Sequence, residues 1–425
     1  MCLWITGGNV RAQEIPRPSL ARQQEQQTVP TDYNIKIGQV LLTADVKVTG
    51  QFNDNVYLTP KAESDFEVRP EFGLNIAWHA TELNVLQLRT AVSYTKYLNH
   101  SDLDSENLEL APNSALTFSV FVGDFKIQFH DMFSLENDTV SNGSLSGVAK
   151  LPRFNNTVGV SILWDMNDVM WTVGYDHYNF ITLGDAVTAQ GTSKQDLSQL
   201  NHSTEQVSTS VTAALNSSTQ LGLEGVFSYS QYPNDPNSDY SSFSVGPVFQ
   251  CQMTKYTAIT LEGGYKGYSF QAGPPQLVQD SSGALSIVPG TDAGISTGYY
   301  ADLSVIHRLN RFYSDRFEVG HEDDADPVTG RAQSNYVRYR ANWNWNSKLT
   351  FGIGLFFEQV TTSSTPTSGA FQSDYMRWGG NVSTAYKVTK YVNLSLAYEF
   401  TKKDADDPTQ SYTQNTVSLT LGYIF

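Results

Sequence analysis

The chain has 425 residues, a mean hydropathy of −0.33 and no apolar run of the ~18 residues that a transmembrane helix needs. Its formal net charge of −16 would repel a phosphate backbone, so no nucleic-acid partner is expected. The only cysteines, Cys2 and Cys251, form no CxxC or Cys/His spacing. We therefore expect no zinc site, no internal disulfide and no cofactor.

The N-terminal segment differs in composition from the rest of the chain. Val10-Arg11-Ala12 before Gln13 is typical of the end of a secretory signal, but residues 1–8 are too short for its apolar core. We interpret this as a truncated or misplaced start. Residues 13–32 are rich in Gln, Pro and Arg and predict a disordered periplasmic lead-in. The expected division is 1–34 for the signal-like segment and lead-in, and 35–425 for one folded domain.

From residue 40 onward the chain alternates strand-like runs with turn signals. In chain order, the predicted strands are 40–52, 66–79, 83–97, 113–123, 125–135, 154–165, 169–180, 203–215, 218–231, 240–250, 256–268, 298–310, 311–321, 335–346, 348–361, 373–387, 391–403 and 411–425. Connections alternate between short turns, such as Gly123-Asp124 and Asn310-Arg311, and long polar links, such as 181–202 and 269–297. This rhythm predicts an all-β, single transmembrane, antiparallel up-and-down barrel of about eighteen strands, with about sixteen as the alternative.

The last strand shows the period of two most clearly. Val417, Leu419, Leu421, Tyr423 and Phe425 alternate with small or polar residues, as expected when one face meets lipid and the other a wet interior. An aromatic end to the closing strand resembles the signal that outer-membrane barrels present to their assembly machinery. We therefore expect Val417–Phe425 to pair with Thr43–Thr49 and close the barrel.

Aromatic residues predict two girdles at the membrane interfaces. The first set, near short turns, is Trp78, Trp164, Trp171, Trp343 and Trp345. The second set, near long loops, is Tyr97, Tyr178, Tyr229, Tyr268, Tyr299, Tyr336 and Tyr375. The alternative is that these aromatics form the core of a soluble β-sandwich.

Charged residues on the opposite strand faces predict the lining of a pore. On strands 298–387 they are Arg308, Arg316, Arg338, Arg340, Arg377, Lys387, Asp302, Glu318 and Glu358. Elsewhere they are Glu67, Arg69, Glu71, Arg89, Asp45, Lys47, Lys126, Glu224, Glu262, Lys266 and Glu399. The first wall is net basic, which favours anionic or hydroxyl-rich solutes, with Arg338 and Arg340 near the narrowest zone. The alternative is that these arginines pair with lumen carboxylates and hold the wall together.

A barrel of this size encloses an aqueous or a plugged lumen. The lead-in is too short and polar to form a plug, so we expect passive diffusion of small hydrophilic solutes. The stretch 271–297, rich in Gly, Pro and Ser, either folds into the lumen or stands outside.

Neither a metal site nor an enzyme is expected. The acidic runs 321–326, 404–407 and 234–239 lack the spacing of an EF-hand and indicate solvated loop charge rather than calcium sites. His130-Asp131 and Asp176-His177 place their side chains on opposite strand faces, so neither pair forms a ready dyad, and there is no GxSxG motif. A barrel enzyme is the lesser alternative.

The first strand pair carries a family resemblance. Residues 41–60, followed by Ser64-Asp65-Phe66 and Pro70-Glu71-Phe72-Gly73-Leu74, resemble the opening of the outer-membrane β-barrel porins associated with exopolysaccharide gene clusters. The resemblance covers about forty residues. It implies an outer-membrane barrel, with a role in surface polysaccharide export as the alternative to a porin.

The expected location is the outer membrane of a Gram-negative-type bacterium. The expected partners are outer-membrane lipid and lipopolysaccharide, the barrel assembly machinery through Phe425, small hydrophilic solutes or polysaccharide, and in a homo-oligomer further copies of the chain.

Overall fold

The computed structural model describes residues 33–137, 148–188, 194–195, 197–234, 238–270, 276–279, 285–288, 294–324, 331–363 and 374–425. The expectations for residues 1–32, for most of 271–293 and for parts of several other long loops lie outside these residues. Within them, no helix is long and apolar enough to cross a lipid bilayer.

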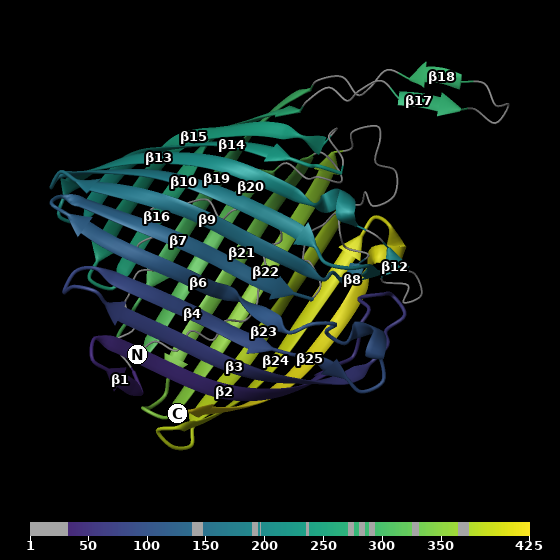
Figure 1. Cartoon of the computed structure of the whole chain (residues 1–425), viewed down its shortest axis with the longest axis horizontal. Coiled ribbons are helices and arrows are strands. Elements are labelled where there is room, and N and C mark those ends of the chain that lie inside the picture. Colours follow the sequence, from purple (N-terminus) through teal and green to yellow (C-terminus); the bar gives the residue numbers. More distant parts are fainter. Residues whose placement is uncertain are drawn as a thin grey trace.

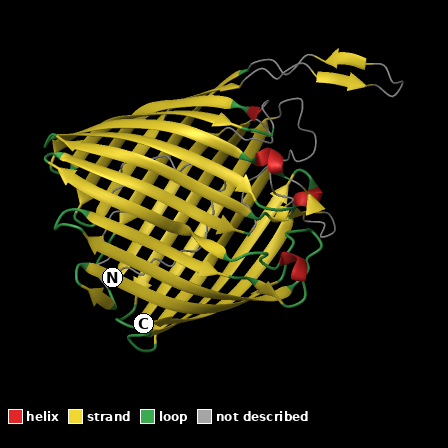
Figure 2. Ribbon diagram, viewed as in Figure 1, coloured by secondary structure: helices red, strands yellow, loops and turns green. Residues whose placement is uncertain are grey.

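The described chain forms a closed antiparallel β-barrel of eighteen strands (Figures 1 and 2). In order around the barrel these are β2 (Val40–Asn53), β3 (Asp65–His79), β4 (Val85–Ser93), β6 (Glu109–Val122), β7 (Phe125–Glu136), β9 (Arg153–Asp165), β10 (Val169–Thr182), β13 (His202–Asn216), β14 (Thr219–Gln231), β15 (Tyr240–Thr254), β16 (Thr257–Phe270), β19 (Ile295–His307), β20 (Tyr313–Asp324), β21 (Arg331–Asn344), β22 (Leu349–Ser363), β23 (Tyr375–Lys387), β24 (Val392–Ala405) and β25 (Tyr412–Ile424). Each predicted strand is present, and the prediction of an eighteen-stranded barrel is confirmed.

The closing seam joins the first and last strands of the barrel. β25 pairs antiparallel with β2 from Asp45↔Ile424 to Asn53↔Thr416, and Phe425 N donates to Ala44 O at 3.1 Å. The pairing expected for Val417–Phe425 is therefore confirmed. The N- and C-terminal ends of the described barrel lie near each other at the end that carries the short turns (Figure 1).

Short polar side chains stabilise the turns at that end of the barrel. In each case a side-chain oxygen of Asp, Asn or Thr near the start of the turn accepts a hydrogen bond from the backbone N–H two residues later, which favours the turn conformation. The acceptors are Thr81, Asp165, Asn216, Thr254, Asn310, Asn346 and Thr389. Gly123, with φ +59°, supplies the left-handed backbone of the remaining turn. The turn expected at Asn310-Arg311 is longer, spanning 308–312 between β19 and β20.

The long connections lie at the other end and carry the remaining elements. These are β5 (Lys96–Tyr97), β8 (Val148–Lys150), β11 (Ala186–Thr188), β12 (Lys194–Gln195) and the 3₁₀ helices η1 (Ser101–Leu103), η3 (Ser198–Leu200) and η5 (Pro408–Gln410). β17 (Gln276–Gln279) and β18 (Leu285–Val288) pair only with each other, and β1 (Ile35–Ile37) pairs with the start of β2. Two buried apolar clusters join the loops here: one includes Val148, Leu151, Phe180 and Leu197, the other Val56, Tyr57, Leu103 and Val187.

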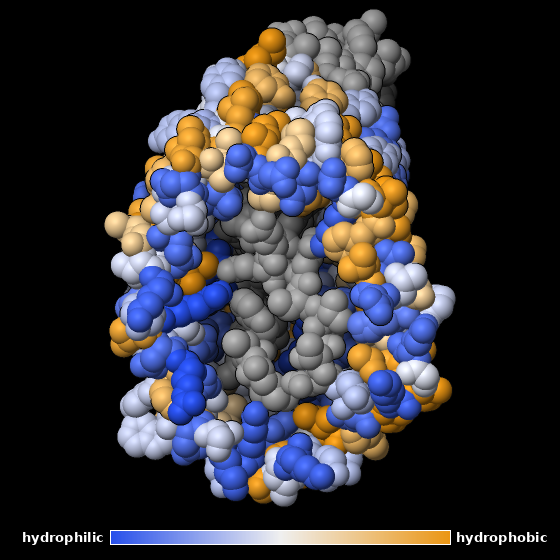
Figure 3. Space-filling model, turned by 90° about the vertical axis from the view of Figure 1, so that its left-hand side faces the viewer, coloured by the Kyte–Doolittle hydropathy of each residue, from blue (hydrophilic) through white to orange (hydrophobic). Residues whose placement is uncertain are grey.

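The outer surface of the strands is apolar. Along β25, Val417, Leu419, Leu421 and Tyr423 are all about half exposed, and the residues between them lie on the inner face. On most of the barrel strands exposed apolar residues recur at alternate positions in the same way, so the outer surface of the barrel is largely apolar. Viewed from the short-turn end, the rim is largely hydrophilic and the sides carry hydrophobic patches (Figure 3).

The structure confirms one expected aromatic girdle and corrects the other. Trp78, Trp171, Trp343 and Trp345 are exposed near the short turns, as predicted. Near the long loops, however, four of the seven tyrosines face inward and are buried. These are Tyr178, Tyr268, Tyr336 and Tyr375. The expectation failed for them because proximity to a loop does not decide which face of a strand a residue occupies.

Candidate functional site

The inner face of the barrel carries the charged residues singled out in the sequence. A contiguous group lies on β20 to β23, because the strand registers align Arg316 with Arg340, Glu318 with Arg338, and Glu358 with Arg377. We call Arg316, Glu318, Arg338, Arg340, Glu358 and Arg377 the basic wall. It contains four cations and two carboxylates, so it is net basic.

Part of the basic wall is internally paired. Arg316 Nη2 lies 2.8 Å from Glu318 Oε1, and Arg377 Nη2 lies 2.7 Å from Glu358 Oε2. The Arg338 guanidinium stacks 4.1 Å from the centroid of the Tyr336 ring. The alternative that the arginines hold the wall together therefore applies to Arg316 and Arg377. Among the described residues, Arg340 has no ion-pair partner and is exposed.

The other predicted lining residues lie in three places. Glu67, Arg69 and Glu71 share the inner face of β3, where Glu67 is buried and Glu71 accepts from Lys47 Nζ at 2.8 Å. Arg89 on β4 lies opposite Asn75 on β3. Arg308 follows β19 at the short-turn end and is exposed. These residues thus form separate groups along the wall rather than one site.

Buried carboxylates and tyrosines form a further inner group beside the basic wall. The Tyr336 hydroxyl donates to Asp302 Oδ2 at 2.5 Å, and the Tyr300 hydroxyl donates to Glu224 Oε1 at 3.1 Å. Both rings are 2% exposed. Asp302, a predicted pore-lining residue, therefore serves first as the acceptor of a buried hydroxyl.

The acidic run at 321–326 is largely strand and not loop. His321–Asp324 belong to β20, where Asp323 pairs with Arg331 and Asp324 with Lys266, while residues 325–326 lie outside the described residues. Asp407 of the run 404–407 accepts from Thr409 N at 2.9 Å and caps η5. Among the described residues, no group of three or more His, Cys, Asp or Glu side chains is arranged to hold a metal ion.

The wall formed by β10, β13 and β14 is chemically different from the basic wall. These are the seventh to ninth of the eighteen strands, whereas the basic wall occupies the thirteenth to sixteenth, so the two walls lie on different sides of the lumen. Apart from the carboxylates of Asp176 and Glu224, the inner faces of these strands present mainly hydroxyl and amide groups. Those less than 9% exposed are Thr172, Thr204, Gln206, Ser208, Ser210, Thr212, Ser228 and Ser230. We call these residues the neutral wall, and we expect the two walls to polarise the lumen across its width.

One histidine and one aspartate meet on the inner face beside the neutral wall. His130 on β7 and Asp176 on β10 both lie opposite Gly159 of the intervening β9, and His130 Nε2 is 2.7 Å from Asp176 Oδ1. The sequential pairs His130-Asp131 and Asp176-His177 do split between the two faces, as expected. The sequence analysis missed this cross-strand pair because the pair depends on the register of three strands. Two signals were available in the sequence: His130 and Asp176 each fall on the inner face in the predicted alternation, and a glycine, Gly159, lies on the strand between them.

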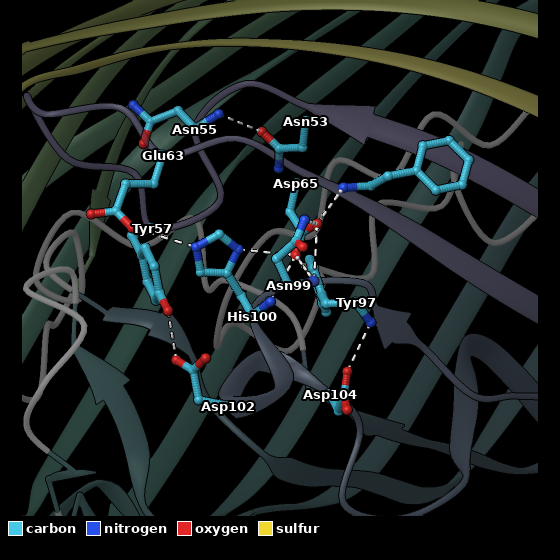
Figure 4. Close-up of polar contacts among 11 residues, drawn as sticks. Asn53, Asn55, Tyr57, Glu63, Asp65, Tyr97, Asn99, His100, Asp102 and Asp104 are labelled. Atoms are coloured by element: carbon cyan, nitrogen blue, oxygen red, sulfur yellow. Dashed lines mark hydrogen bonds and ion pairs between the residues drawn. The ribbon is translucent and has the colours of Figure 1, made fainter.

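The long loops on one side of the mouth are tied together by a polar network (Figure 4). The Asp65 carboxylate accepts from Asn99 N, from His100 N and from His100 Nδ1, each at 2.9 Å. The Tyr57 hydroxyl donates to Asp102 Oδ2 at 2.7 Å and its ring meets the His100 ring edge-on. These contacts hold loop 54–64 against loop 98–108 at the external rim.

His100 is the titratable centre of this network. Burial favours the neutral imidazole, but hydrogen bonds to Asp65 and Glu63 and the charges of nearby carboxylates outweigh it and raise the pKa of His100 above its ordinary 6.5. His100 Nε2 lies 3.4 Å from Glu63 Oε2. The protonated imidazole therefore bridges two loops through two carboxylates.

The loop expected to narrow the lumen lies mostly outside the described residues. Its described part, β17 and β18, forms a separate two-stranded ladder and shares no pairing with the barrel. Figure 1 draws β17 and β18 beyond the barrel and not in the lumen, and residues 295–297 belong to β19; for the rest of the stretch both the inward and the outward position stay predictions.

Comparisons with known proteins concern the architecture. The chain is similar to the crystal structures of Pseudomonas aeruginosa OccK2 (OpdF) in complex with glucuronate, with a TM-score of 0.49, 10% identity and coverage of 92% of this chain and 99% of the other. It is also similar to OpdQ of the same organism, with a TM-score of 0.47, 11% identity and coverage of 92% of this chain and 99% of the other. For Pseudomonas aeruginosa OpdK with vanillate the TM-score is 0.44 at 10% identity, with coverage of 90% of this chain and 99% of the other.

No protein-family profile and no curated protein matches the sequence. The resemblance to exopolysaccharide-associated porins is therefore not supported. Strand pairing and the apolar outer surface decide the location: a closed antiparallel barrel with this exterior spans a membrane, and such single-chain barrels belong to the outer membrane of Gram-negative bacteria. The chain is an outer-membrane β-barrel.

Proposed function

We propose that this barrel is a channel for passive diffusion of small hydrophilic solutes, with a mild preference for anions. The observation that carries the proposal is the contrast between the apolar outside and the polar inside of a closed barrel of eighteen strands. A barrel of this circumference encloses more space than wall side chains fill. The basic wall, with the exposed Arg340, supplies the anion preference.

The test is ion selectivity in planar lipid bilayers. With a KCl gradient across the membrane, the reversal potential of the native protein should indicate more chloride than potassium flux. In Arg338→Ala plus Arg340→Ala, the permeability ratio should fall roughly twofold toward potassium, because two cations leave the basic wall. The control is Lys402→Ala, whose side chain pairs with Asp404 at the outer surface. An unchanged reversal potential in the double variant would refute the anion preference, and the absence of any conductance would refute the channel.

The remaining partners follow from this proposal. We expect lipid and lipopolysaccharide around the apolar surface and recognition of the β25 end by the barrel assembly machinery. No described feature favours a role in polysaccharide export or in catalysis over diffusion.

A further inference from the structure

We propose that the inner wall holds a binding subsite for a neutral, polyhydroxylated solute such as a sugar, formed by His130, Asp176, Gln206 and Ser208. The subsite rests on the proposed channel function and gives one solute class a place within it. It lies on β7, β10 and β13, on the half of the barrel away from the basic wall.

Two glycines make the floor of this subsite. A Cβ at Gly159 would overlap Asp176 Oδ1 and lie 2.6 Å from His130 Nε2, and a Cβ at Gly174 would lie 2.6 Å from Ser208 Oγ. Real Cβ atoms do not approach so closely. The absent side chains therefore let polar groups of β7, β10 and β13 converge over the bare backbone of Gly159 on β9 and Gly174 on β10.

An unsatisfied donor lies directly beside the His130–Asp176 pair. Gln206 is the cross-strand neighbour of Asp176, and Ser208 is that of Gly174. Gln206 is 6% exposed, and its Nε2 has no hydrogen-bond partner in the described part of the chain. The Thr172 hydroxyl on the same wall is also buried without a hydrogen-bond partner in the described part of the chain. A buried donor without a hydrogen-bond partner costs about 1–3 kcal/mol, so a polar ligand that pairs with these groups would be bound favourably.

The chemistry of the group matches hydroxyl groups. When His130 donates from Nε2 to Asp176, its Nδ1 and the second carboxylate oxygen of Asp176 remain acceptors, while Gln206 Nε2 donates and Ser208 Oγ does both. A vicinal diol offers one donor and one acceptor per hydroxyl and can satisfy such a mixed set at once.

Charge argues against an anion or a bare cation at this place. The nearest inward-facing cations on β7 and β9 are Lys126 and Arg153, which lie four and six residues along their strands, roughly 13 and 20 Å away. Arg153 is already paired with Glu136. The one carboxylate of the subsite is bound to His130, and no metal-holding group is found among the described residues.

The test is sugar binding by saturation-transfer NMR on the full chain in detergent micelles, with glucose as the probe and glucuronate as its charged counterpart. Because the basic wall can bind glucuronate elsewhere in the lumen, the subsite is read from the variants: Gln206→Leu should weaken glucose binding more than glucuronate binding. Gln206→Leu and the isosteric Asp176→Asn should each weaken glucose binding about tenfold, since each removes hydrogen bonds from a desolvated site. The control Gln220→Leu, on the inner face of β14 near the short turns, should retain native binding.

Equal glucose binding in all four proteins, or an equal loss of glucose and glucuronate binding in Gln206→Leu, would overturn the subsite. Bilayer conductance of the native protein in KCl, measured alongside, tests the channel itself. A conducting protein that fails to bind glucose refutes the subsite alone, whereas a protein without conductance refutes the proposed function whatever the binding result.

Discussion

Small residues and short polar side chains place the groups of the inner wall. Gly159 allows His130 and Asp176 to meet across an intervening strand, and Asp65 gathers donors from a loop more than thirty positions away in the sequence. In both cases one carboxylate organises groups that the chain order keeps apart.

Gly159→Ala should therefore destabilise the barrel by about 1–3 kcal/mol, because the new Cβ forces the His130–Asp176 pair apart. The measurement is the urea-unfolding midpoint in micelles. Gly225→Ala is the matched control, since a Cβ there meets its nearest atoms at 3.7 and 3.9 Å, which is ordinary contact. Equal midpoints for the two variants would contradict the close-approach argument.

The raised pKa of His100 predicts that the loop network weakens with rising pH. The folded pKa exceeds the ordinary 6.5, so the stabilisation is complete below pH 6.5 and is lost as pH rises through the folded value. Hydrogen exchange of Asn99 and His100 amides should accelerate over that range beyond the chemical rate. In His100→Asn this additional pH dependence should vanish; its persistence would assign it to another group.

Each strand of the barrel has two unlike faces, and the alternation is what fixes its register. On β24, Leu396 is 47% exposed on the outer surface, whereas Ala397 faces inward between Ser383 and Ser418. A slip of one residue would exchange these faces along the whole strand.

Leu396→Arg should accordingly cost about 2–4 kcal/mol if the site lies near the bilayer midplane, because the guanidinium must enter lipid. Ala397→Arg, one residue away, should cost clearly less since its side chain enters the polar lumen. Folding into lipid vesicles, followed by the heat-dependent shift in electrophoretic mobility, compares the two. Equal losses would show that the faces are wrongly assigned.

At the scale of the whole molecule, stability depends on closure. Without the ladder between β2 and β25, two edges would expose unpaired backbone groups to lipid, each costing several kcal/mol. Closure also brings the basic and neutral walls to one lumen, because only in a ring do the inner faces of β20 to β23 and of β10 to β14 line the same space.

Removal of residues 417–425 should prevent formation of the compact, heat-modifiable barrel, since nine residues of the seam are lost together. As a control, Ile35→Ser plus Ile37→Ser changes two exposed side chains of β1 and should leave the barrel intact. A compact, protease-resistant barrel in the truncated protein would contradict the role of the seam.

The sequence by itself determined the strands, their two faces, the short turns and the seam. These properties are local or periodic: alternation reveals a strand face, and Asn, Thr or Gly at a turn acts within a few residues. What only the tertiary structure decided is which inner side chains become neighbours. His130 meets Asp176, Arg377 meets Glu358, and Tyr336 turns inward to Asp302, because these contacts depend on the register between strands, which no single strand encodes.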